Sequence, residues 1–533
     1  MSEQQPFRIG VVCHGSHVPQ WQARCIRNLE EQRGIEVVGI AHVPDSAPAR
    51  RIRDFFEMRL GGALFPKSGK LVPIDENIRG HRGRHGEDSK SVQAVIEELR
   101  AKGASAILSF LFEQVQLPGT TSIPIWRFDI HGQGLGPNGL PRFRTWMLRE
   151  QPVTADLIST NGGSMRAVFN DRAVSGGMDM DSVMFGAAWL PVAMARAKEH
   201  DRWTGPASVE RTSAPPFPIL LLRWARTELR NTFSGRRRSA IAGEWNIGVY
   251  PHPIATLLED QGNTNVRWLN SPSPGSHRSE PFGYRATDGQ LNVLYRKGEG
   301  VNSADVIARV RPRNDGILKR SRTMLSTVAD LGYPFVIERP DGAYVLISYL
   351  HQQRTELFRV AEDNDTLDHM RTVLDRAIVN PTCVSHEGRW WLFGTDPEAP
   401  DGVLHAFHAS EFDGPYTPHR HDPVKMTGSG CRPAGTFFYH DGSLWRPSVD
   451  NTDPLALGVI FNRVVELDAD RYHEEAQHTL PGFPRTTYNK GIRTVCAMGD
   501  ITLVDGIRPA PEAREMEAAD SGSLRKPKEY LEE

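Results

Sequence analysis

Four side chains that could do chemistry occupy the same place in a repeated segment, each directly before a proline. They are Glu280, Tyr333, Asn380 and Arg432. A carboxylate such as Glu280 can act as an acid or a base, whereas the amide of Asn380 cannot. The guanidinium of Arg432 can grip a carboxylate or phosphate through two parallel hydrogen bonds. If these positions converge, the sequence predicts a site for a sugar or an anionic group.

Two further polar residues follow in the fourth repeat. Arg446 precedes a proline, and Asp450 comes shortly after it. Asp450 could supply the second carboxyl group that cleavage of a glycosidic bond needs beside Glu280. Three hypotheses stay open for these residues: hydrolysis of a glycan, binding of a sugar or anion, and, for Arg432 and Arg446, a structural ion pair between blades.

The repeated segment itself predicts the fold of the second half. Copies lie at 280–291, 333–344, 380–391 and 432–445, and a degenerate fifth copy runs over 491–506. Proline is tolerated at a strand start and Asp-Gly favours a tight hairpin, so each copy predicts strand, turn, strand. Five copies with a period of about 50 residues predict an all-β, five-bladed propeller over 246–510.

A second candidate site lies in the N-terminal half. Asp129 and His131 stand at the end of a predicted strand, before a Gly-rich loop, where α/β sheets bind ligands. His14 follows the first predicted strand and precedes a helix, whose N-terminus can present backbone N–H groups to an anion. The alternatives are a structural Asp-x-His and a solvent-exposed loop histidine.

The elements that would position these residues alternate between strand and helix, as in βαβ units. We expect strands over 7–13, 36–43, 104–112 and 123–130 and helices over 21–29 and 89–102. The sequence therefore predicts an open parallel-sheet α/β domain over 6–200. A linker with a short helix follows at 201–245, and a charged tail follows the propeller at 511–533.

Composition excludes several classes of protein. The 63 Lys and Arg residues nearly balance the 65 Asp and Glu residues, which argues against a nucleic-acid partner. No apolar run reaches the roughly 18 to 20 residues of a spanning helix, and the start lacks a secretory signal, so we expect a cytoplasmic protein. Apolar residues beside arginines at 219–230 leave a membrane-surface helix as the minor alternative to a docking helix. Five scattered cysteines predict free thiols and no metal site.

The propeller half resembles a known group. Tyr333-Pro334-Phe335, Asn380-Pro381-Thr382 with 388–393, and Arg432-Pro433-Ala434-Gly435 are similar to motifs of five-bladed propellers of the arabinanase and invertase type. They are closer to the propeller domain of plant glucosamine inositolphosphorylceramide transferases and bacterial homologues. In the glycosidases of this superfamily, funnel carboxylates act on the glycosidic bond. Asn380 departs from that pattern, because relatives carry Asp at the matching position.

Residues 6–200 resemble the Rossmann-like, folate-dependent formyltransferase domain of methionyl-tRNA and sugar N-formyltransferases. The Asn-x-His of that family looks like 129–131, its Leu-Pro-Arg looks like 140–142, and its later Asp looks like Asn161. The resemblance implies that His131, Asp129 and Asn161 are catalytic, that Arg142 contacts substrate and that 10-formyltetrahydrofolate is the cofactor. Formyl transfer needs donors for an oxyanion, and Asp129 in the Asn position departs from that need.

Together these patterns predict a transferase in glycan or specialised-metabolite biosynthesis, most concretely a formyltransferase-like enzyme acting on an amine. The alternative is a carbohydrate-processing or carbohydrate-binding propeller whose N-terminal domain is not catalytic. A third hypothesis is a binding protein in which both sites have lost their acids. A small molecule or sugar is the expected substrate, and the sequence leaves the oligomeric state open.

Overall fold

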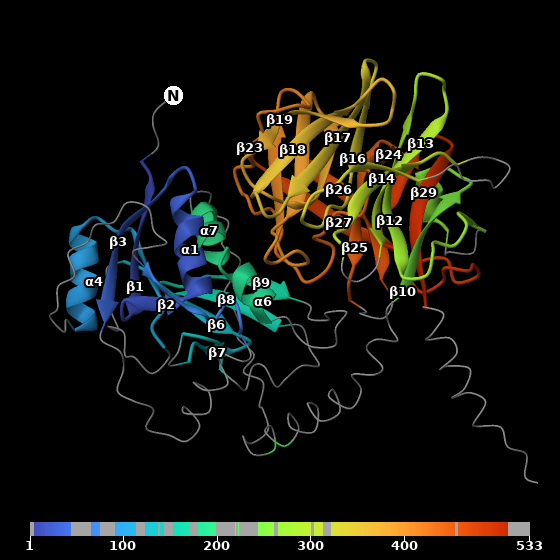
Figure 1. Ribbon diagram of the computed structural model, residues 1–533. Coiled ribbons are helices and arrows are strands. Elements are labelled where there is room, and N and C mark those ends of the chain that lie inside the picture. The colour runs from blue at the N-terminus through green and yellow to red at the C-terminus, as the bar shows by residue number, and fades with distance from the viewer. Residues whose placement is uncertain are drawn as a thin grey trace, which may run out of the picture.

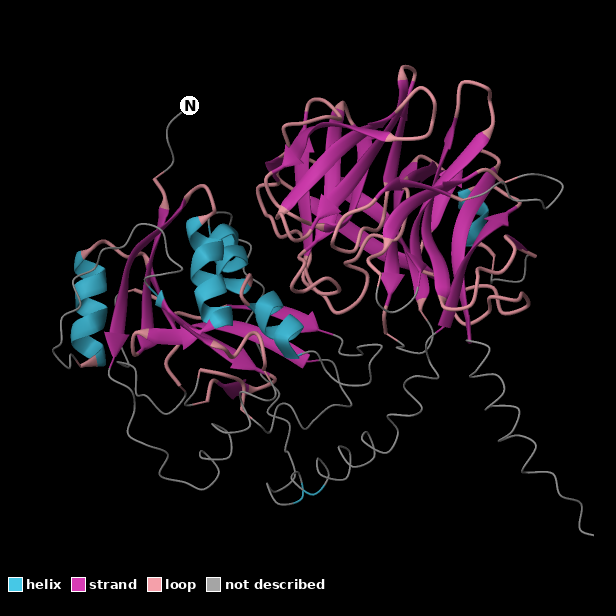
Figure 2. Ribbon diagram, viewed as in Figure 1, coloured by secondary structure: helices cyan, strands magenta, loops and turns pink. Residues whose placement is uncertain are grey.

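In the computed structural model, two parts of different architecture follow one another along the chain (Figure 1). The structure describes residues 5–43, 65–74, 91–112, 123–136, 139–142, 153–169, 180–198, 219, 222, 243–260, 265–299, 303–312, 321–452 and 457–509. Strands and helices alternate up to Lys198, and from Gly243 onward nearly every element is a strand (Figure 2).

The N-terminal part is built on one mixed sheet. Its strands lie in the order β3 (Ile35–Val43), β1 (Phe7–His14), β5 (Ala106–Ser109), β6 (Ile125–Ile130), β8 (Val153–Ser159) and β9 (Ser164–Phe169), with β7 (Gln133–Gly134) paired to β6. The first four strands run parallel, whereas β8 runs antiparallel to β6 and β9 antiparallel to β8. A short pair, β2 (His17–Pro19) and β4 (Leu71–Pro73), stands beside the sheet.

Helices cover both faces of this sheet, because side chains of its central strands alternate between two apolar clusters. Ile9 and Val11 of β1 face a cluster with α1 (Gln20–Glu30), α6 (Met180–Ala187) and α7 (Leu190–Lys198). Val12 of the same strand faces the other cluster, with α4 (Val92–Ala101). The helices α4 and α1 accordingly stand on opposite sides of β1 in Figure 1.

The C-terminal part is a five-bladed β-propeller of five four-stranded sheets. The first blade holds β12 (Ser276–Arg285), β13 (Leu291–Glu299), β14 (Val306–Val310) and β15 (Arg322–Leu325), and the second holds β16 (Phe335–Arg339), β17 (Gly342–Tyr349), β18 (Arg354–Val360) and β19 (Leu367–Leu374). The third holds β20 (Val379–His386), β21 (Arg389–Thr395), β22 (Leu404–Ala409) and β23 (Thr417–Pro418), and the fourth holds β24 (Phe438–His440), β25 (Ser443–Asp450), β26 (Gly458–Leu467) and β27 (Tyr472–Leu480).

The fifth blade joins the two ends of the propeller. It combines β28 (Val495–Met498) and β29 (Ile501–Pro509) from the end of the described chain with β10 (Gly243–Tyr250) and β11 (Arg267–Trp268) from the start of the propeller. Strand β10 pairs antiparallel with β29 along its whole length. This pairing closes the ring of blades and covers edges that would otherwise be exposed.

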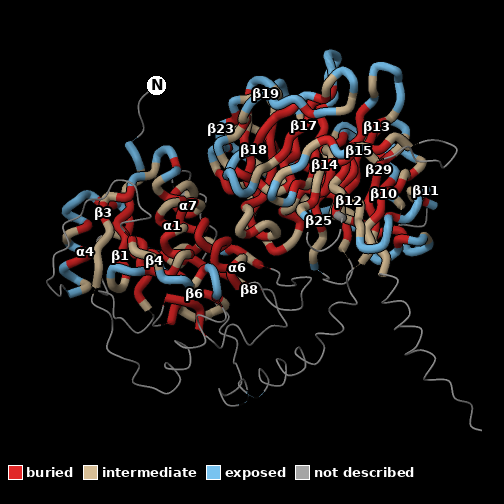
Figure 3. The backbone as a smooth tube through the Cα atoms, viewed as in Figure 1, coloured by how far each residue is buried: buried red, intermediate tan, exposed pale blue. Residues whose placement is uncertain are grey.

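The N-terminal part packs directly against the third blade. Ala399 and Val403, in the loop that follows β21, belong to the same apolar cluster as α1, α6 and α7. Gly402 is placed so closely that a β-carbon there would lie 2.8 Å from the ring of Phe169. Buried residues, red in Figure 3, run through both parts, and the loop contributes Ala399 and Val403 to the core of the N-terminal part.

A buried ionic cluster reinforces this contact. Asp396 accepts hydrogen bonds from Trp189 Nε1 at 3.0 Å and Arg24 Nη2 at 3.3 Å, both from the N-terminal part. Arg376 of the propeller reaches the same oxygen at 3.4 Å and lies over the Trp189 ring. Although burial opposes ionisation, hydrogen bonding from His405 and the two arginines hold the pKa of Asp396 well below its usual range.

Several expectations are confirmed. Each predicted strand and helix of the N-terminal part matches an observed element within a few residues, and all five cysteines are free and buried. The predicted turns are hairpins, as at Glu387-Gly388 and Asp441-Gly442, where both residues have positive φ. The predicted tail lies outside the described residues, and of the linker's predicted helix only Ile219 and Leu222 are described, both helical and exposed. No helix among the described residues is long and apolar enough to cross a membrane.

Candidate functional site

Three of the four residues before the inner-strand prolines share an unusual backbone conformation. Glu280, Tyr333 and Asn380 have φ values of 56°, 50° and 54°, in the left-handed region that side chains other than glycine rarely adopt. At Glu280 and Asn380 the pairing register with the second strand is interrupted. Such a bulge re-aims the side chain of the extra residue. Because every blade begins its inner strand at the same end, these side chains gather at one end of the propeller axis.

There the side chains connect one blade to the next. Asp505 Oδ2 of the fifth blade accepts a hydrogen bond from the Glu280 amide of the first blade at 3.0 Å. Glu280 Oε2 in turn accepts a hydrogen bond from the Tyr333 amide of the second blade at 2.7 Å. The Tyr333 hydroxyl lies 2.9 Å from Thr382 Oγ1 in the third blade and accepts from the Gly435 amide at 2.7 Å. Successive blades are therefore linked through buried polar groups.

Two further contacts close this axial ring. Asn380 Nδ2 donates to the carbonyl oxygen of Pro433 at 2.7 Å, which links the third blade to the fourth. Gly435 pairs with Val495 of the fifth blade, and a β-carbon at Gly435 would lie only 1.6 Å from the Val495 carbonyl oxygen. The ring returns to Asp505, whose carboxylate also accepts the amides of Arg493 and Thr494.

The ring explains what the acidic and amide side chains do. Glu280, Asn380 and Asp505 are each at most 4% exposed. Each of these side chains makes hydrogen bonds to backbone groups. Burial raises the pKa of Asp505, and the three backbone donors oppose that shift. Asn380 acts as a donor to a carbonyl, which a carboxylate in its place could not do.

Three arginines stand against the carboxylates of the ring. Arg296, Arg432 and Arg493 come from the first, fourth and fifth blades, and we call them, with Glu280 and Asp505, the axial cluster. The side chains of Arg296 and Arg432 are 27% and 22% exposed, whereas that of Glu280 is 2% exposed. Arg296 and Arg432 are therefore more exposed to solvent than the carboxylate of Glu280.

The arginines differ in how far their charge is already neutralised. Arg296 bonds to Asp305 at 2.6 Å, and Glu280 and Asp305 raise its pKa although burial opposes that shift. Arg432 reaches only Asp401, at 3.9 Å, and its buried Nε has no hydrogen-bond partner among the described residues. Arg493 lies 4.6 Å over the ring of Trp245. Burial and the nearby Arg432 lower the pKa of Arg493, which an added anion would reverse.

Of the two remaining predicted funnel residues, Asp450 lies at the axial end, next to the pairing of Val449 with Arg432, whereas Arg446 does not face the axis. Arg446 is fully buried inside the fourth blade, where Glu474 binds it through two oxygens at 2.6 and 2.7 Å. The prediction that Arg446 lines the axis is therefore wrong, and the pair joins strands of one blade, not two neighbouring blades. Asp450, at the end of β25, accepts hydrogen bonds from Ser429 and Thr452 and orders the turn that follows it.

In the N-terminal part, the predicted catalytic residues do not meet. His131 begins a tight turn after β6, with positive φ at His131 and Gly132, and burial lowers the pKa of its imidazole. Asn161 lies in an exposed turn at the other end of β6, where Ile125 donates to the neighbouring Thr160. Strand β6 spans Ile125–Ile130, roughly 17 Å. The expectation of one site containing both residues is wrong, and these residues do not fit a 10-formyltetrahydrofolate reaction centre.

Other predicted residues share the edge of the sheet with His131. His14 ends β1, and Asp129 lies near the end of β6, so the parallel strands bring both to the carboxyl edge. His14 packs against Phe112, with ring centroids 5.2 Å apart. Arg142 is 7% exposed, within the core of this part and not at its surface.

Sequence reasoning missed most of the axial cluster. Arg296 and Asp505 lie on second strands, whose inward side chains the repeat motif does not mark. Arg493 precedes the inner strand β28 of the fifth blade, as Arg432 precedes β24. If the degenerate fifth copy had been aligned on its inner strand instead of on Gly491, Arg493 would have matched Arg432.

Sequence comparison finds a family model that matches most of the propeller. The family model described as "Glucosamine inositolphosphorylceramide transferase 1, N-terminal" matches residues 264–486. Glucosamine inositolphosphorylceramide transferases 1 of Oryza sativa subsp. japonica and Arabidopsis thaliana are each 23% identical to this chain over 256 residues, which cover 44% of it and 34% of the relative. The chain thus spans about a third of the length of these curated relatives.

Solved structures similar to this chain include glycoside hydrolases. A family 117 enzyme of Zobellia galactanivorans has a TM-score of 0.33 at 9% identity and covers 51% of this chain and 92% of its own. An α-L-arabinanase of Cellvibrio cellulosa has a TM-score of 0.27 at 15% identity and covers 37% of this chain and 77% of its own. The five-bladed architecture itself rests on the sheets described above.

Proposed function

We propose that the propeller binds the anionic group of a carbohydrate at the axial cluster, in the service of glycan transfer. One observation carries this proposal: Arg432 and Arg493 lie at the axis with no carboxylate within 3.5 Å among the described residues. Arginine forks match the geometry of phosphate and carboxylate groups. The indole of Trp245, under Arg493, adds an aromatic surface of the kind that packs against a sugar ring.

The likeness to plant transferases narrows the candidate ligand. Those relatives are named for inositolphosphorylceramide, whose headgroup joins a polyhydroxylated ring to a phosphate. This is the combination that two arginines beside an indole would recognise. An inositol phosphate is therefore the ligand class that we favour.

Hydrolysis by the axial carboxylates has less support than binding. A glycosidase needs two carboxyl groups whose oxygens can reach the scissile bond. Glu280 and Asp505 instead accept hydrogen bonds from backbone amides of neighbouring blades. Folate-dependent formyl transfer has no support from the geometry of Asp129, His131 and Asn161.

Calorimetric titration of the intact chain tests the proposal. We expect myo-inositol 1-phosphate to bind and myo-inositol to bind far more weakly, because the phosphate is the recognised group. Arg432→Gln and Arg493→Gln should each weaken binding by about tenfold or more, as charge-assisted hydrogen bonds do. Arg354→Gln, on the half-exposed Arg354 of the second blade, is the matched control. Equal binding of both probes, or full binding by both axial variants, would reject the proposal.

A further inference from the structure

The loop that joins β21 to β22, residues 396–403, lies between the N-terminal part and the axial cluster. Strand β20 begins at the axial end and β21 returns antiparallel to it, so the loop stands at that end. Ala399 and Val403 bury their side chains in the apolar core of the N-terminal part. Asp401, between them in the sequence, instead pairs with Arg432 of the axial cluster at 3.9 Å. One short loop therefore contacts both the N-terminal part and the proposed ligand site.

Polar contacts from the N-terminal part hold the first half of this loop. Trp189 Nε1 donates to the Asp396 carboxylate at 3.0 Å, and Ser182 Oγ donates to the backbone carbonyl of Glu398 at 3.0 Å. Arg24 Nη1 lies 3.6 Å from the Glu398 carboxylate. The three donors come from α1, α6 and the turn before α7, so the loop is fixed against several elements of the N-terminal part.

The second half of the loop is held by its own backbone. The amides of Gly402 and Val403 both donate to the carbonyl oxygen of Ala399, at 3.0 and 3.2 Å. Asp401 is enclosed in this turn, so its position follows that of the loop as a whole. Its side chain is 45% exposed, and its ion pair with Arg432 is long. Such a pair contributes little stability, and a ligand anion can replace it.

We propose that the N-terminal part is a positioning module for the axial site: through this loop it holds Asp401 as a counter-ion of Arg432, which a ligand anion must displace. The inference rests on the function proposed for the axial cluster. Asp401 then acts on the ligand through Arg432, as a positioning residue. Because coupling between two sites is reciprocal, releasing the loop from the N-terminal part should favour ligand binding, as removing the Asp401 charge should.

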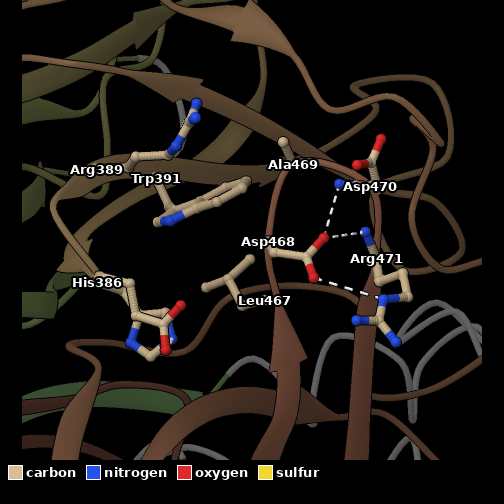
Figure 4. A pocket seen from close by; sticks show the side chains of 9 residues that line it. His386, Arg389, Trp391, Leu467, Asp468, Ala469, Asp470 and Arg471 are labelled. Carbon is tan, nitrogen blue, oxygen red and sulfur yellow. Dashed lines mark hydrogen bonds and ion pairs between the residues drawn. The ribbon is translucent and has the colours of Figure 1, made fainter.

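The test is calorimetric titration of the full chain with myo-inositol 1-phosphate. Asp401→Asn removes the competing charge, so we expect binding to become about two- to fivefold tighter. Asp401→Glu keeps the carboxylate and should bind nearly as the unmodified chain does, whereas a purely structural role would not separate Asn from Glu. Asp470→Asn is the matched control, because Asp470 pairs with Arg420 at 2.9 Å in the turn that joins β26 to β27, at the other end of the propeller (Figure 4).

Variants at the interface test whether the N-terminal part acts through the loop. Ser182→Ala removes the hydrogen bond to the loop backbone, and Trp189→Phe removes the one to Asp396 while keeping an aromatic ring. Each should tighten binding by about two- to threefold, because the loop holds Asp401 less firmly. In the Asp401→Asn background neither change should add anything, since the competing carboxylate is already gone. Asn161→Ala, in an exposed turn of the same part, should bind as the unmodified chain does.

Two results would overturn this inference and leave the proposed function standing. In the first, the unmodified chain binds myo-inositol 1-phosphate and Asp401→Asn binds it no more tightly. In the second, the effects of Ser182→Ala and Asp401→Asn simply add, which would mean that the interface does not act through Asp401. If neither the unmodified chain nor Asp401→Asn binds the phosphate, the proposed function fails and this inference fails with it. A melting curve for each variant separates a change in affinity from a loss of folded protein.

Discussion

The carboxyl edge of the N-terminal sheet and the axial end of the propeller differ in how far their predicted site residues converge. Both were predicted to gather polar residues from the ends of successive strands. At the sheet edge, Asp129 and His131 lie on one strand, and Asn161 lies at the opposite end of that strand. At the axis, equivalent positions of all five blades meet, because the same element order is repeated around one line.

The difference teaches that repetition positions residues more reliably than resemblance does. In a repeat, one register fixes the place of every copy. In a sheet whose strands change direction, a residue one hairpin away can fall at the wrong edge. At the axis the carboxylates of Glu280 and Asp505 link neighbouring blades, whereas Arg432 and Arg493 have no carboxylate within 3.5 Å among the described residues.

Removing the Asp505 carboxylate should have the largest effect on the ring. Asp505→Ala leaves three backbone amides of two blades without their acceptor, so we expect a loss of about 3–5 kcal/mol in stability. Thermal unfolding of the full chain measures it. Asp500→Ala, in the exposed turn before β29, is the matched control. Equal melting temperatures for both variants would mean that the ring does not hold the blades.

Acid should weaken the buried ion pair of Arg446 and Glu474 inside the fourth blade. Burial raises the pKa of Glu474, but the neighbouring Arg446 outweighs this effect and lowers the pKa from 4.5 to about 2. A depressed carboxyl pKa stabilises the fold above pH 4.5, and this stabilisation is lost as the pH falls toward 2. The stability advantage over Glu474→Gln should therefore shrink by about 3 kcal/mol across that interval. Denaturant unfolding at several pH values checks this, and a constant advantage would contradict it.

Asn380→Asp distinguishes a ring donor from a lost catalytic base. The new carboxylate would face the Pro433 carbonyl with two acceptors and no donor, so we expect a loss of about 1–3 kcal/mol at neutral pH. No glycosidase activity should appear, because the position points to a neighbouring blade. Aryl glycoside assays beside melting curves make the measurement. A stable variant that hydrolyses glycosides would show that Asn380 occupies a catalytic position.

Asn161→Ala should have the smallest effect. The side chain is exposed in a turn, so stability should change by less than about 0.5 kcal/mol. Binding of inositol phosphate should not change either. If Asn161→Ala changed any activity of the protein by more than tenfold, Asn161 would belong to a functional site after all.

More of the fold than of the candidate site could be predicted from the sequence. Proline and Asp-Gly or Glu-Gly pairs have strong local preferences, so four of the five hairpins and the convergence of Glu280, Tyr333 and Asn380 could be predicted. Arg446 was misplaced because one strand alternates between two faces, and its partner Glu474 lies two strands away in the sheet. Arg493 and Asp505 escaped notice because the fifth blade is assembled from both ends of the propeller.

A crystal structure of the full chain with myo-inositol 1-phosphate tests the central claim most directly. The account predicts the phosphate within hydrogen-bond distance of Arg432 and Arg493, with the hydrogen bonds of Glu280 and Asp505 to the backbone intact. A phosphate bound elsewhere, or an axial ring that opens so that Glu280 contacts the ligand, would contradict it.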